Sequence, residues 1–505
     1  MRAVLFLSAA LLAAAAPSSE SFRSLSSRQT NSAPISRPVK GLFDSTSNSK
    51  DVTPEKSAVQ TPPKFVDQNH MITNAKEVTS MLNANIYFDQ ILKALGAISN
   101  GSIPEKDVPS AVQNLFLAAS PTATPVSVAD SMSKAKSAFE IQNASPTGNA
   151  SEPNYMASAL GLMMDGFVND DVRNTDAVPV FANPPVPGDK SFYTKEGNAP
   201  FSVPEELLRS AIQIPPTFSW GQKQPVLMCP GTGATGFETF STTVGKLLAT
   251  TDFADPVYLI IPGRLMDDVQ INAEFVAYAI QYMNVMTNRN VAAVTWSQGS
   301  LDVQWALKYW PSTRNVVTDF IPLSPDFRGT KLAHLLCSAK TQRDMIACTP
   351  AVYQQTYNSR LISTLRRDGG DSAYVPTTTV YSQYDEVVQP QTGRGASGFI
   401  GDANGVGVSN NLLQEVCQGQ EGAGGFLHEG VIYSATAYAL IVDALTHDGP
   451  ADIERVRGSC SQTTPAGVMD ADVLQVEALM VVILFRLLTF TPKVSAEPAI
   501  KDYAA

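Results

Sequence analysis

The stretch Ala292-Ala293-Val294-Thr295-Trp296-Ser297-Gln298-Gly299-Ser300-Leu301 decides the fold of this chain. It is apolar and β-prone as far as Trp296, and the segment 300–310 that follows has a helical pattern. Ser297 therefore lies on a sharp turn between a strand and a helix, where its hydroxyl stands clear of the backbone. The usual pattern at such turns is Gly-x-Ser-x-Gly. Because Thr295 occupies the first position here, an ordinary strand-to-helix turn is the alternative interpretation.

Length and composition narrow the class of protein. The 505 residues are enough for two or three domains, and with 44% hydrophobic and 16% charged residues most of the chain should be globular. The formal net charge is −11, which argues against nucleic-acid binding because that function needs a basic surface. An acidic balance of this kind suits a soluble secreted protein.

The first residues have the features of a secretory signal peptide. One positive charge, a short apolar run and small residues precede Pro17, so we expect residues 1–18 to be removed. The run is too short and too rich in alanine for a membrane span, which is the alternative interpretation. We therefore expect an extracellular protein without a stable membrane anchor.

Cysteine usage agrees with an oxidising compartment, in which two disulfides and one leftover thiol are expected from five cysteines. Local spacing favours pairing of Cys337 with Cys348 and of Cys417 with Cys460. Cys229 ends an apolar run and is expected to be a buried free thiol.

The region before residue 201 has its own organisation. Residues 19–64 are rich in Ser, Thr, Pro and Asn and are expected to form a disordered linker. Residues 65–175 contain four segments with one apolar stripe each, which predicts a small helical bundle. Its separateness suggests a propeptide, an inhibitory module or a folding-assistance module. Residues 176–200 form a Pro-rich connector. Glycosylation sequons begin at three asparagines between the expected helices, so a glycoprotein is expected: Asn100, Asn143 and Asn149.

Residues 201–505 alternate short apolar runs with helical segments. The expected strands are 225–229, 256–261, 291–296, 317–323 and 375–381, and the expected helices include 274–286, 300–310 and 351–365. Such alternation predicts an α/β fold with a mostly parallel sheet flanked by helices. Active sites in these sheets lie at the carboxyl ends of strands, and Ser297 is at such an end.

A serine nucleophile needs a histidine base, and the chain has four histidines. In α/β-hydrolases the serine, the acid and the histidine follow one another in that order. His70 lies in the N-terminal region, His334 precedes every good acid candidate, and His447 coincides with a helix C-terminus signal. His428 lies in a glycine-flanked loop leading into a helix and is the candidate base.

The acid and the oxyanion donors come from two other loops. Asp385 and Glu386 follow a late strand, and periodicity cannot choose between adjacent carboxylates. For the developing oxyanion we expect the backbone N–H of Gln298 and the loop 229–236, where Thr232 offers an amide and a hydroxyl. A phosphate-binding interpretation of this Gly-rich loop lacks both Gly-x-Gly-x-x-Gly and a following Lys-Ser/Thr.

Together these residues resemble the fungal lipase B family of α/β-hydrolases, from about residue 204 to the end of the chain. The threonine at the first position of the serine turn is also that family's residue. The matching stretches occur in the family's order with similar spacing: Pro-Gly-Thr-Gly-Ala-Thr-Gly (230–236), Thr-Trp-Ser-Gln-Gly (295–299), Ser-Pro-Asp-Phe-Arg-Gly-Thr (324–330), Val-Tyr-Gln-Gln-Thr (352–356), Val-Pro-Thr-Thr (375–378) and Tyr-Ser-Gln-Tyr-Asp-Glu-Val-Val-Gln-Pro (381–390).

The resemblance implies a role for each candidate residue. The nucleophile, acid and base would be Ser297, Asp385 and His428, and the oxyanion hole would be formed by Thr232 and Gln298. The pocket would contain Trp296 as the floor of its alcohol side, Asp326 as a nearby acidic residue, and Gln355 or its neighbour as a polar residue. The pair Cys417–Cys460 matches a family disulfide, while two other disulfides of the family are absent.

The resemblance also implies a secreted serine ester hydrolase, with triacylglycerols as the expected substrate. We expect a monomer acting at a lipid–water interface, with no metal or organic cofactor. The region 331–351 is a few residues longer than in the family, which predicts a larger lid tied by Cys337 and Cys348. The apolar segment 476–488 is expected to form a helix over the acyl pocket. The alternatives are an esterase or cutinase-like enzyme for non-lipid esters, and a hydrolase-like binding protein without activity.

Overall fold

The computed structural model describes Ser133 and residues 181–188, 196–337, 348–490 and 492–505. The chain divides into two compact units, 1–171 and 172–505. The expected signal peptide, linker and helical bundle lie outside the described residues, apart from Ser133. The fold below is that of the second unit.

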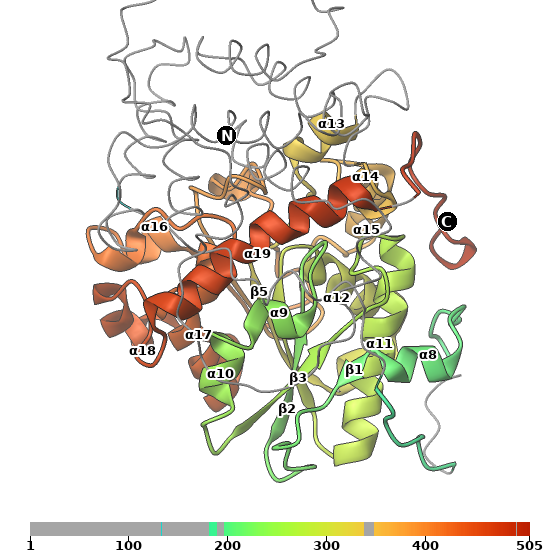
Figure 1. The fold of residues 1–505 in the computed structure, drawn as a ribbon, viewed down its shortest axis with the longest axis horizontal. Helices are drawn as coiled ribbons and strands as arrows, with labels where there is room; N and C mark the ends of the chain where they lie inside the picture. Colours follow the sequence, from blue (N-terminus) through green and yellow to red (C-terminus); the bar gives the residue numbers. More distant parts are fainter. Residues whose placement is uncertain (1–132, 134–180, 189–195, 338–347, 491) are drawn as a thin grey trace, which may run out of the picture. The chain divides into compact units, whose positions relative to one another are not determined.

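In the described part of this unit, seven strands form one sheet in the order β1-β3-β2-β4-β5-β6-β7. β1 pairs with β3 in antiparallel fashion, and the other neighbours are parallel. The mostly parallel sheet flanked by helices confirms the predicted α/β-hydrolase fold (Figure 1). The strands are β1 Ile212–Gln213, β2 Gln224–Cys229, β3 Ala254–Leu259, β4 Val291–Trp296, β5 Val317–Leu323, β6 Thr377–Tyr381 and β7 Val408–Leu412.

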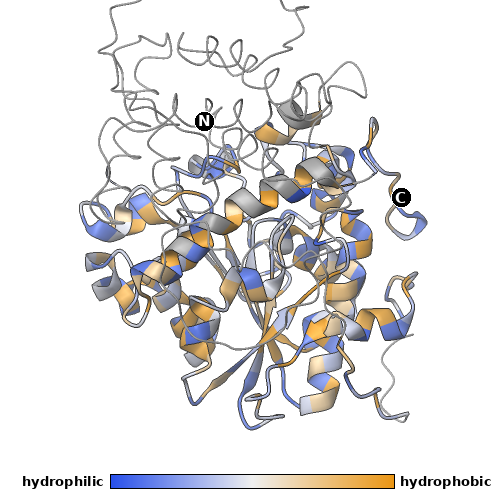
Figure 2. Cartoon of the chain, viewed as in Figure 1, coloured by the Kyte–Doolittle hydropathy of each residue, from blue (hydrophilic) through white to orange (hydrophobic). Residues whose placement is uncertain are grey.

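Helices lie on both sides of the sheet, with α11 and α12 on one side and α10 and α17 on the other (Figure 1). Most helices carry both hydrophobic and hydrophilic residues, as expected for elements with one buried face (Figure 2). The helices are α8 Glu205–Ser210, α9 Gly236–Phe240, α10 Val244–Leu248, α11 Val269–Thr287, α12 Gln298–Tyr309, α13 Lys331–Cys337, α14 Pro350–Gln354, α15 Arg360–Arg366, α16 Leu413–Val416, α17 Ala435–Thr446, α18 Ile453–Val456 and α19 Asp470–Thr489.

Strand β4 lies at the centre of the core. All six of its residues are buried, as expected for a parallel strand covered by helices on both faces. Large side chains from the neighbouring elements complete this core, including Tyr278 of α11, Trp305 of α12 and Phe320 of β5. The strand that carries the candidate serine at its end is therefore held rigidly by its surroundings.

Three details of the predicted elements are wrong. The expected helix 351–365 is two helices, α14 and α15, because Asn358 adopts a left-handed φ of 57° and the Ser359 hydroxyl caps α15 by accepting from the amide of Ile362 at 3.1 Å. The short edge strand β1 and the Ser/Asn-rich strand β7 were not predicted, because neither has an apolar run.

Both predicted disulfides are confirmed, Cys337–Cys348 and Cys417–Cys460, with Cys229 as a buried free thiol. Residues 338–347 of the expected lid lie outside the described residues. The expected apolar tail helix is confirmed within α19. Among the described residues, no helix is both long and apolar enough to cross a membrane.

Candidate functional site

Ser297 forms a strained turn between β4 and α12. It has φ 54° and ψ −130° and is the N-cap of α12. A Cβ on Gly299 would overlap the carbonyl oxygen of Pro230, so only glycine lets the turn approach the end of β2. The off-pattern Thr295 is accommodated because its Oγ1 lies 2.7 Å from the Oγ of Ser300. This is the geometry of a nucleophile elbow.

Sheet order brings the glycine-rich loop to the serine. The chain runs from β2 to β3 on one side and then returns to place β4 on the other side of β2, so the connections diverge at the carboxyl end of β2, the position at which open α/β sheets bind their ligands. Cys229 at the end of β2 pairs in register with Thr295 in β4. A Cβ on Gly231 would lie 2.8 Å from the Cβ of Ser297, so the loop backbone is directly against the serine.

The candidate oxyanion residues share one hydrogen-bond network. The Oγ1 of Thr232 donates to the Oε1 of Gln298 at 2.5 Å and accepts from the Nε2 of Gln355 at 3.0 Å. Gln355 Nε2 also lies 2.8 Å from Gln298 Oε1. The amide of Gln298 is the first of α12 and therefore has no acceptor within the helix. Side chains thus fix the two segments whose backbone amides would face an oxyanion.

His428 and Asp385 form a buried pair. The Nδ1 of His428 lies 2.8 Å from the Oδ2 of Asp385. The other carboxylate oxygen, Oδ1, accepts from the backbone amides of Val387 and Val388 at 2.9 and 2.6 Å. Donation from Nδ1–H to Asp385 leaves Nε2 as the unprotonated ring nitrogen of a neutral imidazole.

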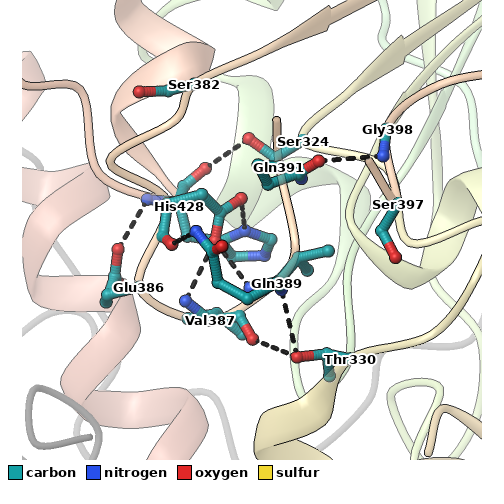
Figure 3. Close-up of polar contacts among 12 residues, drawn as sticks. Ser324, Thr330, Ser382, Glu386, Val387, Gln389, Gln391, Ser397, Gly398 and His428 are labelled. Atoms are coloured by element: carbon teal, nitrogen blue, oxygen red, sulfur yellow. Dashed lines mark hydrogen bonds and ion pairs between the residues drawn. The ribbon is translucent and has the colours of Figure 1, made fainter. Parts of the chain in front are cut away.

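Three further contacts hold the backbone and ring of His428. Its amide donates to the Oε2 of Glu386 at 2.9 Å, and its carbonyl accepts from the Oγ of Ser324 at 2.8 Å (Figure 3). The Nε1 of Trp296 donates to the same carbonyl at 3.1 Å, and the centroids of the Trp296 and His428 rings lie 5.0 Å apart. Trp296 is the neighbour of Ser297, so the imidazole lies beside the elbow. Sequence reasoning missed Ser324, whose position just after β5 was the available signal.

Buried carboxyls surround the imidazole. Burial raises the pKa of Asp326 to about 7, and burial with the charge of Asp385 raises the pKa of Glu386 to about 7. Neither carboxylate oxygen of Asp326 has a hydrogen-bond partner among the described residues. Burial lowers the pKa of His428, but the neighbouring carboxylates raise it, and the net direction is upward from 6.5.

These shifts predict the acid limb of a pH profile. Only neutral His428 can accept a proton, so kcat/KM should fall as the pH drops through its pKa. Because that pKa is raised, the midpoint should lie above 6.5. Asp326→Asn removes a negative charge and should lower the midpoint. The matched control is Asp319→Asn, a buried carboxyl whose pKa is also about 7 but which lies near the opposite end of β5. Equal shifts in both variants, or a wild-type midpoint below 6.5, would contradict this assignment.

Of the other three histidines, the structure describes the side chain of His447. His447 is the C-cap of α17, as expected, with its Nδ1 3.0 Å from the carbonyl oxygen of Asp443. His70 and the side chain of His334 lie outside the described part of the structure. No group of three or more His, Cys, Asp or Glu side chains in the described part is arranged to hold a metal ion.

Comparisons with known proteins give two informative matches. Lipase B of Pseudozyma antarctica is 35% identical over 193 residues, which are 38% of this chain. The matched region spans about half (54%) of the length of that relative. No protein-family model matches the chain.

The second match is the crystal structure of Aspergillus fumigatus lipase B, with 37% identity and a TM-score of 0.68. The match covers 85% of this chain and 99% of that one. Because a relative of this identity is matched over almost its whole length, the chain belongs to the fungal lipase B family.

Proposed function

We propose that this protein is a secreted serine hydrolase of carboxylic esters, with triacylglycerols as its substrates. The observation that carries the proposal is the buried His428–Asp385 pair, 2.8 Å between Nδ1 and Oδ2, beside a serine on a left-handed elbow. Family membership supports the same reaction class. The two disulfides support an oxidising compartment, and hence secretion.

In the proposed mechanism the Nε2 of His428 removes the proton from the Oγ of Ser297 as this oxygen attacks the ester carbonyl carbon. Asp385 keeps the imidazole in the required tautomer and stabilises its charged form. The imidazolium then protonates the leaving alcohol, and an acyl-enzyme remains. Water, activated by the same histidine, attacks the acyl group, and Ser297 recovers its proton. No metal or organic cofactor takes part.

The tetrahedral intermediates carry a negative oxygen that needs preorganised donors. We assign this role to the backbone amides of Thr232 and Gln298. The Thr232 hydroxyl donates to the Oε1 of Gln298, and rotation about χ1 would turn it toward the substrate. Gln355, which contacts both residues, would hold them in place as the polar pocket residue.

The remaining assignments concern the substrate pocket. Trp296 is buried against His428 and would form the floor on the alcohol side. Asp326 would influence the charge of the imidazole. The apolar helix α19 packs beside α9 and would face the acyl chain, which favours lipid esters over polar ones. We propose that the protein acts as a monomer at a lipid–water interface.

The test combines labelling with a substrate series. A p-nitrophenyl alkylphosphonate should react once per molecule, with Ser297 forming the new oxygen–phosphorus bond and p-nitrophenolate leaving. Peptide mass analysis should place the label on Ser297. Initial rates should then be compared for triolein, tributyrin and p-nitrophenyl acetate.

Labelling of Ser297 with preferred hydrolysis of emulsified long-chain triacylglycerol would support the proposal. Labelling with activity restricted to soluble short esters would favour the esterase alternative. A protein that takes up no label and hydrolyses none of these esters would be a binding protein, and the proposed function would be wrong.

A further inference from the structure

A buried cation lies on the apolar helix α19. The side chain of Arg486 is only 5% exposed. Its Nη1 donates to the carbonyl oxygen of Gly233 at 2.9 Å and to the Oε2 of Glu238 at 3.0 Å, and its Nη2 donates to Glu238 Oε1 at 2.8 Å. Two parallel bonds to a carboxylate give a guanidinium a defined orientation. Because the guanidinium is oriented in this way, the direction of its third hydrogen bond, to the carbonyl oxygen of Gly233, is also fixed.

Gly233 belongs to the turn that carries the candidate oxyanion donor. Its amide donates to the carbonyl oxygen of Arg264 at 2.7 Å, and the amide of Ala234 closes the turn on the carbonyl of Gly231 at 3.2 Å. Gly233 has φ +79°. Thr232 lies directly before it. The carbonyl of Gly231 and the amide of Gly233, on either side of Thr232, are both hydrogen-bonded, so these bonds set the direction of the Thr232 amide. The carbonyl of Gly233 is in turn held by Arg486.

Glu238 links this contact to a second element. Its Oε2 accepts from the amide of Thr235 at 2.9 Å, while the Oγ1 of Thr235 accepts from the amide of Glu238 at 3.2 Å. This capping box begins α9 immediately after the turn. Arg486 therefore binds a carboxylate that is already fixed at the helix start, so that the turn, α9 and α19 form one connected unit.

We infer that Arg486, oriented by Glu238, is a positioning residue for the oxyanion hole, because it holds the Gly233 carbonyl and thereby the Thr232 amide that would stabilise the transition state. The inference rests on the proposed function. Donors misaligned in the transition state lower kcat, whereas ground-state binding of an ester chain is expected to change less.

The structure offers a matched control on the same helix. Lys246 of α10 forms an ion pair with Asp472 near the start of α19, with Nζ and Oδ2 2.7 Å apart. This pair also attaches α19 to its surroundings but involves neither the turn nor α9. Loss of this pair reports the effect of loosening α19, and loss of the Arg486 contact reports the effect on the turn as well.

The experiment uses the full chain with the substitutions Arg486→Met, Arg486→Lys, Glu238→Gln and Lys246→Met, assayed on a soluble p-nitrophenyl ester. Arg486→Met should lower kcat roughly 10- to 100-fold with a much smaller change in KM. Arg486→Lys keeps one cationic donor and should recover part of this loss. Glu238→Gln should give an intermediate loss, and Lys246→Met should remain close to wild type.

Amide hydrogen exchange gives a readout that needs no turnover. Exchange in the segment 231–236 should be faster in Arg486→Met and unchanged in Lys246→Met. If Arg486→Met does not fold, Arg486→Lys and Glu238→Gln carry the same test. An unchanged kcat with unchanged exchange, or equal losses in Lys246→Met, would overturn the inference. A wild-type protein inactive on every ester would instead contradict the proposed function, while the exchange measurement would still decide the positioning contact.

Discussion

Ser297→Ala should reduce kcat/KM for ester hydrolysis on the order of 10⁶-fold, because the reaction then lacks the oxygen that forms the acyl-enzyme. Residual turnover would come from the oxyanion donors and from substrate binding alone. The measurement is the initial rate on a p-nitrophenyl ester series at high enzyme concentration, with burst analysis of the wild type. Phosphonate labelling should be lost in the same variant.

Alanine is close to serine in size and meets the same φ of 54°, so the fold should be kept. The matched control is Ser300→Ala, three residues further along in α12. The Ser300 hydroxyl lies 2.7 Å from the Thr295 hydroxyl and is fully buried. Its removal should cost about 1–3 kcal/mol of stability but leave most of the turnover. Turnover by Ser297→Ala above about 1% of wild type would show that another group performs the attack.

The serine turn could be predicted because strong local patterns stand on both sides of it. An apolar strand and an amphipathic helix leave only Ser297 and its neighbours for the turn, whatever the rest of the fold does. The proximity of the 230–236 loop to Ser297 could not be predicted in the same way. It depends on the pairing of Cys229 with Thr295, a register set by the whole sheet. Sequence reasoning could place both at carboxyl ends of strands but not side by side.

Sequence patterns could not decide whether Asp385 or Glu386 is the acid. Adjacent residues in a loop have no periodicity to separate them, and both carboxylates in fact contact His428, one through the ring and the other through the backbone amide. Only the family resemblance favoured Asp385. The contacts of Arg486 could not be predicted from local patterns at all, since its partners Gly233 and Glu238 are separated from it by 253 and 248 positions.

The second large effect should separate these two carboxylates. In Asp385→Asn the amide oxygen should take the place of Oδ1, because the amides of Val387 and Val388 both donate there. The amide nitrogen would then face the Nδ1 of His428 and force the ring proton onto Nε2. That tautomer cannot accept a proton from Ser297, and kcat should fall on the order of 10⁴-fold with little change in KM.

Glu386→Gln is the matched comparison, an acid-to-amide change one residue away. Its amide oxygen can still accept from the amide of His428, and its nitrogen would occupy the place of Oε1, which has no partner among the described residues. The loss of kcat should therefore stay below about 10-fold, since the loop position is kept and only a nearby charge is removed. Thermal unfolding of both variants checks that each is folded. A larger loss in Glu386→Gln than in Asp385→Asn would reverse the assignment, because the backbone contact of Glu386 would then matter more to the reaction than the ring contact of Asp385.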